Sequence, residues 1–333
     1  VLFQHSLLLT TDGQIFASGL NTYGQLGCSN YNDSFSLIPV DMAVFGSKKV
    51  VQISAGDYHS IALTSDGKLY AWGSNNNGRL GDGTTKNQNS PIAVDMTGVL
   101  SGKFVTQISA GASHSMALTS EGQVFTWGFN LYGQLGDGST VDRTKAVVVP
   151  LSGRKVVQIA AGYWHSTILT SDGSVFSWGY NGEGQLGDGT ILDRAVPIPL
   201  FTGGALYGKF VTQITAGYSG SMVLTSDNSI YTWGYNFYGQ LGDSTIVNHL
   251  EPVKVQSQAY TGKAIAQISM GDYHSMVLTT DNQLFTWGRN LEGQIGDGTT
   301  TGHFTPFRIN TTMVGAWKTF TAIATGDYQT MTL

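Results

Sequence analysis

Five histidines, each followed by serine, occupy one repeated position in the sequence. They are His5, His59, His114, His165 and His274. Imidazoles transfer protons near neutral pH and bind zinc, so such a set could be a catalytic or metal centre. Successive copies of a repeat need not converge in space, and two other copies hold Gly220 and Gln329 at this position. We therefore interpret these histidines as structural hydrogen-bonding groups, and we expect no catalytic residue and no metal site.

Aspartates form a second periodic set, each in a Gly-Asp-Gly or Gly-Asp-Ser turn. They are Asp82, Asp137, Asp188, Asp243 and Asp297. One carboxylate per copy does not supply the clustered oxygen ligands of a calcium site. Aspartate in a turn more often bonds the nearby backbone, and we expect this role here. We expect the same loop-shaping role for Asn21, Asn75, Asn130, Asn181, Asn236 and Asn290.

A glycine-rich string carries these residues and sets the period of the chain. Its first glycines are Gly19, Gly73, Gly128, Gly179, Gly234 and Gly288, spaced by 51 to 55 residues. A period this regular over the whole length predicts one domain, residues 1–333. The third copy is typical, with β-branched, alternating runs at 105–110, 114–119 and 123–127 separated by turn residues. Asp-Gly between the second and third runs, as at Asp66 and Gly67, is a hairpin signal.

A fourth run in each copy contains proline, as at 91–94 and 197–200, which favours an edge strand. The sequence thus predicts an all-β fold, a β-propeller of four-stranded antiparallel blades. The tryptophan before the string glycine, as at Trp178, is expected to pack between blades. Seven positions can begin the second strand, whereas the string occurs six times. We predict seven blades with an incomplete terminal blade; the alternative of six blades would leave a redundant strand at one end.

Composition excludes several classes of function. Charged residues are only 12% of the chain, the net charge of −5 is spread without a basic run, and we expect neither nucleic-acid nor membrane binding. Cys28 is the single cysteine, so no intramolecular disulfide forms. The pattern implies no cofactor. The cytoplasm is slightly favoured over a secreted location, and the start at Val1 suggests a processed product or a piece of a longer protein.

The motifs Gly-x-x-His-Ser, Leu-Thr-x-Asp-Gly and Trp-Gly-x-Asn-x-x-Gly-Gln-Leu-Gly-Asp-Gly resemble the regulator of chromosome condensation repeat. The resemblance covers essentially the whole chain and implies a β-propeller. Members of that family include exchange factors for the small GTPase Ran, plant ultraviolet-B receptors, inhibitors of β-lactamase and interaction domains of ubiquitin ligases. The even repeats here leave no room for the exchange factor's β-wedge. Trp164 is the only tryptophan in a Gly-x-x-His loop, unlike the receptors' repeated Gly-Trp-Arg-His-Thr.

Aromatic residues vary between copies at the turn between the first two strands and at the loop after the third. Antiparallel alternation places both segments at the same end of the blades. The residues expected to bind a partner there are Tyr58, Phe129, Tyr132, Tyr163, Trp164, Tyr180, Glu183, Tyr218, Tyr235, Tyr238, Tyr273 and Arg289. The same segments also carry Tyr23, Phe237 and Tyr328, and Asp57, Asp272, Asp327 and Glu292 would form a mildly acidic rim. Some of these rings are expected to fold inward.

Tyrosine and tryptophan offer large contact area at low entropy cost, and they are enriched in binding surfaces. We therefore expect a non-enzymatic scaffold that binds a protein partner, or a second copy of itself, through the aromatic loops. Two alternatives stay open. They are guanine nucleotide exchange on a small GTPase and inhibition of another enzyme.

Overall fold

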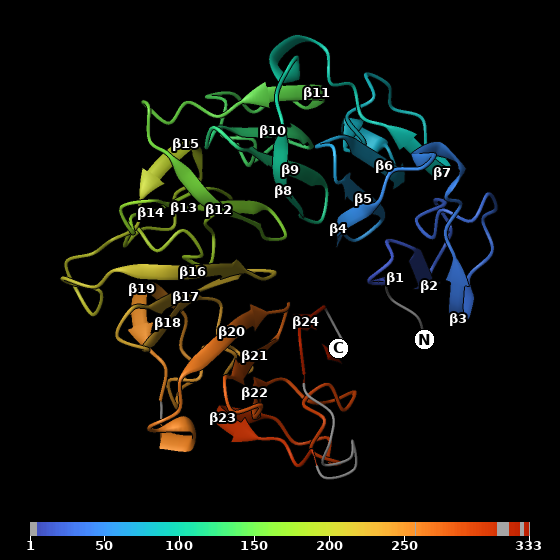
Figure 1. Ribbon diagram of the computed structural model, residues 1–333. Coiled ribbons are helices and arrows are strands. Elements are labelled where there is room, and N and C mark those ends of the chain that lie inside the picture. Colours follow the sequence, from blue (N-terminus) through green and yellow to red (C-terminus); the bar gives the residue numbers. More distant parts are fainter. Residues whose placement is uncertain (1–4, 257, 312–319, 327–329, 333) are drawn as a thin grey trace.

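The computed structural model describes residues 5–256, 258–311, 320–326 and 330–332. These residues form antiparallel sheets arranged radially around a central channel, with β4, β8, β12, β16 and β20 nearest the axis (Figure 1). The described connections contain four 3-10 helices: Ala43–Phe45, Asn76–Gly78, Gly98–Leu100 and Gln258–Tyr260. Within the described residues, no helix is long and apolar enough to cross a membrane.

Five sheets have four strands in sequence order from the channel outward. The first strands are β4 (Val50–Ala55), β8 (Val105–Ala110), β12 (Val156–Ala161), β16 (Val211–Ala216) and β20 (Ile265–Met270). The second strands are β5 (His59–Thr64), β9 (His114–Thr119), β13 (His165–Thr170), β17 (Gly220–Thr225) and β21 (His274–Thr279). The third strands are β6 (Leu69–Gly73), β10 (Val124–Gly128), β14 (Val175–Gly179), β18 (Ile230–Gly234) and β22 (Leu284–Gly288). The fourth strands are β7 (Gln88–Ala93), β11 (Arg143–Val148), β15 (Arg194–Pro199), β19 (His249–Lys254) and β23 (His303–Arg308).

The prediction of seven blades is wrong, because the described residues form six. Blade 1 contains β1 (His5–Leu9), β2 (Ile15–Gly19) and β3 (Ser34–Pro39), and blades 2 to 6 are the four-stranded sheets in chain order. The segment expected to begin a seventh blade is a two-stranded hairpin of β24 (Ile323–Thr325) and β25 (Thr330–Thr332). Counting possible second strands overestimated the number, since a blade also needs the third and fourth strands that flank each glycine-rich string.

Local sequence explains the strand order. The Asp-Gly hairpins form as expected, with Gly173 at a positive φ of 80° between β13 and β14. The fourth strand is the outer edge of each four-stranded sheet, also as expected, and it contains proline in all of them except blade 3, where β11 has none. In blade 4 the outer strand begins before its first proline. Gly179 pairs with Arg194 across a bulge, and this pairing extends β15 toward the loop. The second strands of blades 2 to 6 are buried along their whole length, since both faces meet neighbouring blades.

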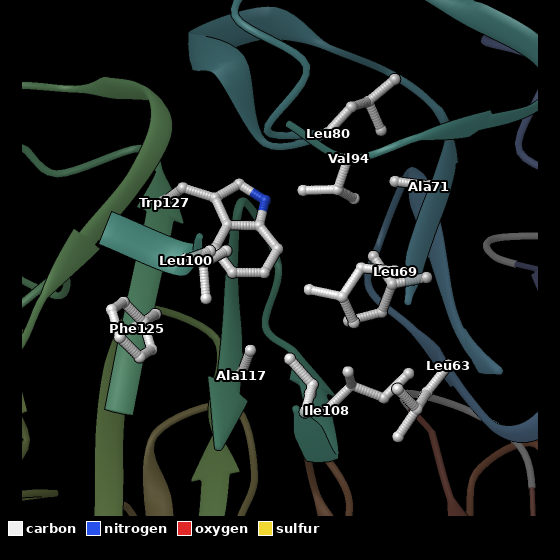
Figure 2. Close-up of a cluster of buried hydrophobic side chains, with 12 residues drawn as sticks. Leu63, Leu69, Ala71, Leu80, Val94, Leu100, Ile108, Ala117, Phe125 and Trp127 are labelled. Carbon is white, nitrogen blue, oxygen red and sulfur yellow. The ribbon is translucent and has the colours of Figure 1, made fainter. Parts of the chain in front are cut away.

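Tryptophan packing joins adjacent blades, as predicted. Trp72, Trp127, Trp178, Trp233 and Trp287 are completely buried. Figure 2 shows Trp127 of blade 3 beside Leu80 and Val94 of blade 2, within a cluster that also holds Leu69 and Phe125. Gly81 is required at this contact, because a Cβ there would lie 2.7 Å from the indole nitrogen of Trp127 and its φ is +71°. The glycine-rich string is therefore part of the inter-blade core.

A repeated hydrogen-bond cluster, here called the inter-blade bridge, accompanies this packing. The main-chain carbonyl of Gln134 in blade 3 accepts the Trp178 indole N–H at 2.8 Å and the Ser166 hydroxyl at 2.9 Å, both from blade 4. Since Ser166 donates to that carbonyl, its oxygen accepts from His114 Nε2 of blade 3 at 2.9 Å. Equivalent bridges centre on the carbonyls of Gln25, Arg79, Gln185, Gln240 and Gln294. In each full bridge, two side chains thus bond one buried carbonyl, and a histidine bonds the hydroxyl of one of them.

One bridge lacks its histidine, and a methionine takes its place. Position 220 in blade 5 is glycine, and Met270 of blade 6 stands where blades 2 to 5 have alanine at the end of the inner strand. A Cβ at Gly220 would lie 2.6 Å from Met270 Cε, so the thioether fills the volume used elsewhere by imidazole. Ser275 still donates to the Gln240 carbonyl at 2.8 Å. The two departures from the repeat compensate one another.

Replacing Ser166 by alanine should destabilise the fold. The change leaves the buried His114 Nε2–H without its acceptor and removes one donor from the Gln134 carbonyl. An unsatisfied buried polar group costs about 1–3 kcal/mol, and we expect that loss of unfolding free energy in urea denaturation. Ser101→Ala, at an exposed serine, is the control and should be neutral. Equal stabilities of the two variants would show that the bridge contributes nothing.

The compensation between Gly220 and Met270 predicts a non-additive pair of substitutions. Met270→Ala should cost about 2–5 kcal/mol through the cavity that it leaves. Gly220→His alone should also destabilise, because the new ring overlaps Met270. The double variant restores the histidine and alanine of the other blades. Its loss of unfolding free energy should therefore be smaller than the sum of the two single losses. A thermodynamic cycle from urea denaturation measures this coupling, and strict additivity would contradict the account.

Candidate functional site: the aromatic loop face

The loops at one end of the blades share a surface, here called the loop face. It consists of the turns between the first and second strands and the loops between the third and fourth strands. Because the four strands of each blade are antiparallel in sequence order, these segments emerge at the same end, as the sequence analysis predicted. The remaining turns emerge at the opposite end.

The glycine-rich string gives the outer loops a fixed shape. In blade 4, Asn181 Oδ1 accepts the main-chain N–H of Leu186 at 2.9 Å, and its Nδ2 donates to Asp188 at 3.1 Å. Asp188 also accepts from the main chain and hydroxyl of Thr190 and from Arg194. Burial opposes ionisation of Asp188, but the bonds from Thr190 and Arg194 outweigh it and hold the pKa of that carboxyl below its ordinary value. Asparagine and aspartate therefore build the loop, as expected.

The bridge histidines are buried and make the predicted structural hydrogen bonds. Burial lowers the pKa of His5 and His274 to about 4, and that of His114 and His165 to about 3. Burial also lowers the pKa of His59 well below its ordinary value. All five are neutral at physiological pH. In the described part of the chain, no three histidine, cysteine, aspartate or glutamate side chains gather in a way that could hold a metal ion.

Ten rings on the loop face form a connected set across blades 3 to 6, here called the aromatic arc. It comprises Phe129, Tyr132, Tyr163, Trp164, Tyr180, Tyr218, Tyr235, Phe237, Tyr238 and Tyr273. Tyr132 of blade 3 lies 5.2 Å from Trp164 of blade 4, and Tyr218 of blade 5 lies 5.6 Å from Tyr273 of blade 6, between ring centroids. Rings from successive blades thus make one surface.

The rings of the arc are neither all folded into the grooves between blades nor all fully exposed. Phe237 is 60% exposed, and the other nine rings are half-buried. Some ring pairs meet edge to face, as Tyr163 and Trp164 do, and others are tilted, as Tyr218 and Tyr273 are, so each ring is held by its neighbours. A partner would therefore meet rings that are already ordered, which lowers the entropy cost of binding.

Three predicted residues lie apart from the arc or outside the described residues. Tyr58 of blade 2 pairs with Tyr23 of blade 1 at 5.3 Å and has no aromatic contact with the arc within the described residues. Tyr328 and Asp327 lie outside the described residues. Between the two aromatic groups, blade 3 has Ala112 and Ser113 where other blades carry tyrosine or tryptophan.

Arg79 fills this interval. It replaces the glutamine of the other strings and is 95% buried, with Nε bonded to the Asn76 carbonyl at 3.0 Å and a terminal nitrogen bonded to Asn77 at 3.3 Å. Burial lowers the pKa of its guanidinium, and the charge of Asp57 opposes that shift. The arc therefore ends at a polar, arginine-containing segment on its blade 2 side.

Charged residues border the arc. Burial raises the pKa of Tyr163, and so do the charge of Asp57 and the hydrogen bond between the two side chains. Tyr163 belongs to blade 4 and Asp57 to blade 2, so this contact joins two blades that are not neighbours. Arg289 lies 5.5 Å from the ring centroid of Tyr238 and 5.7 Å from that of Tyr273, and it pairs with Glu292 at 2.7 Å. Glu183 accepts from Asn248 at 2.6 Å. These contacts fix the rim in place.

Sequence reasoning missed an aliphatic rim beside the arc. Five exposed side chains precede the outer strands of blades 3 to 5: Val141, Ile191, Leu192, Ile246 and Val247. Each is 50–61% exposed. The signal was available, because the equivalent residues are Thr85 and Lys86 in blade 2 and Thr300 and Thr301 in blade 6. The apolar rim and the aromatic arc thus coincide in blades 3 to 5.

The radial antiparallel blades and their loop face define a β-propeller with a concentrated apolar surface at one end. The chain belongs to the RCC1-like domain family, whose model matches residues 3–332. This confirms the resemblance drawn from the repeat motifs.

Relatives and solved structures agree with this assignment. The ultraviolet-B receptor UVR8 of Arabidopsis thaliana is 33% identical over 296 residues, which cover 88% of this chain and 65% of the receptor. The human ubiquitin-protein ligase HERC2 is 34% identical over 295 residues, which cover 88% of this chain and 6% of the ligase. The chain thus spans less than two thirds of the length of these relatives. The crystal structure of human WBSCR16 superposes with a TM-score of 0.88 at 24% identity, covering 99% of this chain and 85% of that one, which shows a shared fold.

Burial of the histidines predicts that unfolding free energy is lost already at pH values above those at which carboxylates titrate. The folded pKa values of the histidines lie below the unfolded value of about 6.5, so the unfolded chain takes up protons first as the pH falls. Unfolding free energy should be lost progressively from pH 6.5 toward pH 4. Urea denaturation at pH 7.0, 6.0 and 5.0 measures this, and His114→Asn should show a smaller loss than the unsubstituted protein. A stability that does not change between pH 7 and 5 would contradict neutral burial.

Proposed function

We propose that this propeller is a non-enzymatic interaction module that binds a protein partner through the loop face of blades 3 to 6. The observation that carries the proposal is the continuity of the aromatic arc from Phe129 to Tyr273. Monomeric proteins rarely expose large contiguous apolar patches without a binding role. The aliphatic rim enlarges the same patch, and no comparable exposed aliphatics precede the outer strands of blades 2 and 6.

The electrostatics favour a partner with basic groups at its margin. Asp142, Glu183 and Asp193 lie on the loop face of blades 3 and 4, whereas the arginines at the start of β11 and β15 are already paired with Asp137 and Asp188. Lysine or arginine side chains could therefore meet both carboxylates and ring faces. The same surface could serve a second copy of the chain, and sedimentation of the purified protein distinguishes that case.

The decisive test compares two triple variants. The loop-face variant Trp164→Ala, Tyr180→Ala, Phe237→Ala removes three rings of the arc. The control variant Val99→Ala, Phe201→Ala, Tyr207→Ala removes exposed apolar residues from connections at the opposite end. Both variants and the unsubstituted protein serve as baits for affinity capture, and the captured protein is then purified and its Kd measured with each bait.

Only the loop-face variant should lose binding. Central aromatic residues each contribute about 2 kcal/mol or more to such interfaces, so its Kd should rise by a factor of about 100 or more. The melting temperature of each variant checks that the fold survives. Binding that survives loss of the three rings, or that is lost equally in the control, would refute the proposal.

Nucleotide exchange and enzyme inhibition are the competing functions. Exchange would require the loop face to displace the switch segments of a small GTPase, and it needs no catalytic base on the propeller. Release of a labelled guanine nucleotide from a panel of small GTPases separates it from plain binding. Faster release that depends on Trp164 would replace the scaffold proposal with an exchange factor acting through the same face.

A further inference from the structure

Three rings of the aromatic arc form a compact cluster across two blades, here called the ring triad. It comprises Tyr132 of blade 3 and Trp164 and Tyr180 of blade 4. Their ring centroids lie 5.0 to 5.7 Å from one another, so each ring contacts the other two. All three residues are half-buried. The triad therefore offers a ligand ring surfaces whose positions are fixed before binding.

The polar groups of these rings can donate hydrogen bonds at the surface. Among the described residues, the hydroxyls of Tyr132 and Tyr180 and the indole N–H of Trp164 make no hydrogen bond, and none of these atoms is enclosed by protein. The same holds, within the described part of the chain, for the hydroxyls of Tyr235 and Tyr238 in blade 5. The arc thus presents a group of donors, from blades 3 to 5, that a ligand with acceptor groups would satisfy.

A carboxylate lies close to the tyrosines of both blade 4 and blade 5. Burial raises the pKa of Tyr180 and of Tyr235, and the charge of Glu183 raises both further. Both hydroxyls therefore keep their protons at physiological pH and can donate. Glu183 is held in place by the amide of Asn248, which donates to it at 2.6 Å. Its charge favours a basic group of a ligand at the point where these two blades meet.

These features distinguish between the known ways in which proteins bind peptide segments. Addition of a β-strand needs a free strand edge, but the free edges of the outer strands lie at the perimeter of the propeller, whereas the arc is built from loops (Figure 1). An amphipathic helix bonds its own main-chain carbonyls and would leave the ring donors unsatisfied. A polyproline II segment has no internal hydrogen bonds, so its carbonyls can accept from those donors.

We propose that the ring triad and the tyrosines of blade 5 bind a proline-rich segment of the partner protein, with a lysine or arginine of that segment beside Glu183. The prolines pack on the rings, and the main-chain carbonyls accept from the hydroxyls of Tyr180 and Tyr235. Such a segment is already ordered when free, as the rings are, which keeps the entropy cost of binding low. This inference rests on the proposed function and specifies the chemistry of the partner.

A labelled, end-capped peptide with the sequence Arg-Pro-Leu-Pro-Pro-Leu-Pro tests the proposal by fluorescence anisotropy with the 333-residue protein. Binding should be saturable. A peptide with alanine in place of every proline keeps the carbonyls but loses the ring packing and the preformed conformation, so it should bind about tenfold more weakly.

Two tyrosine substitutions test the donors separately from the rings. The double variant Tyr180→Phe, Tyr235→Phe keeps both rings and removes two hydroxyls, so the Kd for the peptide should rise about tenfold. Tyr207→Phe is the matched control, because it removes a hydroxyl from a residue that is 80% exposed at the opposite end of the blades. Its Kd should equal that of the unsubstituted protein. The melting temperature of each variant checks that the fold is retained.

The position of the basic residue is tested by a double-mutant cycle. Glu183→Gln removes the charge but keeps an oxygen that can accept from Asn248. This variant should bind the peptide about threefold more weakly, and the unsubstituted protein should show the same loss for a peptide with alanine in place of arginine. Combining the two changes should cause little further loss, because both remove one ion pair.

Several results would overturn the proposal. They are the absence of saturable binding, equal affinity for the alanine peptide, an unchanged Kd for the double tyrosine variant, or strict additivity in the cycle of Glu183 and the peptide arginine. If the peptide fails while the loop face still captures a partner protein, this inference falls and the proposed function stands. Loss of the partner in the control triple variant as well would instead remove the proposed function.

Discussion

The structure depends on one repeated interaction between adjacent blades, in which an indole and a hydroxyl donate to one buried main-chain carbonyl and an imidazole bonds the hydroxyl. At Gln134 the carbonyl belongs to one blade, whereas the indole and hydroxyl that bond it belong to the next. The imidazole of His114 then joins the hydroxyl from the first blade. Burial of apolar side chains alone does not fix the angle between neighbouring sheets, because the hydrophobic effect is non-directional. The bridge adds direction, and its carbonyl lies within the glycine-rich string.

This placement connects stability to function. The carbonyl that accepts the bridge lies in the same string as the asparagine and aspartate that shape the loop, so blade packing and loop shape are set together. A string glycine that packs on a bridge tryptophan, such as Gly81, cannot take a side chain without disturbing that contact, whereas the tips and turns can vary. Blades 3 to 6 fill those free positions with aromatic rings that touch from blade to blade. Rigid support and variable tips are what a binding surface on a scaffold requires.

Much of this could be predicted from the sequence because the repeat encodes it locally. The period, the hairpins, the proline-bearing edge strand and the buried tryptophans all followed from residue types at fixed spacing. The number of blades did not follow, since the motif of a second strand at 329 implies a further blade only if third and fourth strands accompany it. The pairing of Gly220 with Met270 was also beyond local reasoning, because these residues meet only once two blades are packed.

The site was predicted in part for similar reasons. Alternation placed Trp164, Tyr180 and Tyr218 on one face, but it could not show that Tyr58 would pair with Tyr23 instead of joining the arc. The exposed aliphatics before the outer strands were overlooked because the variable segment has no fixed pattern. Comparing Leu192 with Lys86 at equivalent positions would have revealed them. Contacts between blades that are not neighbours, such as that between Asp57 and Tyr163, depend on blade geometry that no local pattern contains.

The central claim is that the bridges hold the blades together until the whole domain unfolds. Hydrogen exchange of the tryptophan indole N–H groups, followed by nuclear magnetic resonance on protein labelled at tryptophan, tests it most directly. The indoles of Trp72, Trp127, Trp178, Trp233 and Trp287 donate to bridge carbonyls, whereas Trp164 lies on the loop face. The account predicts that these five exchange only through global unfolding, with one shared opening free energy, while Trp164 exchanges much faster. Exchange of the five at the rate of Trp164 would contradict it.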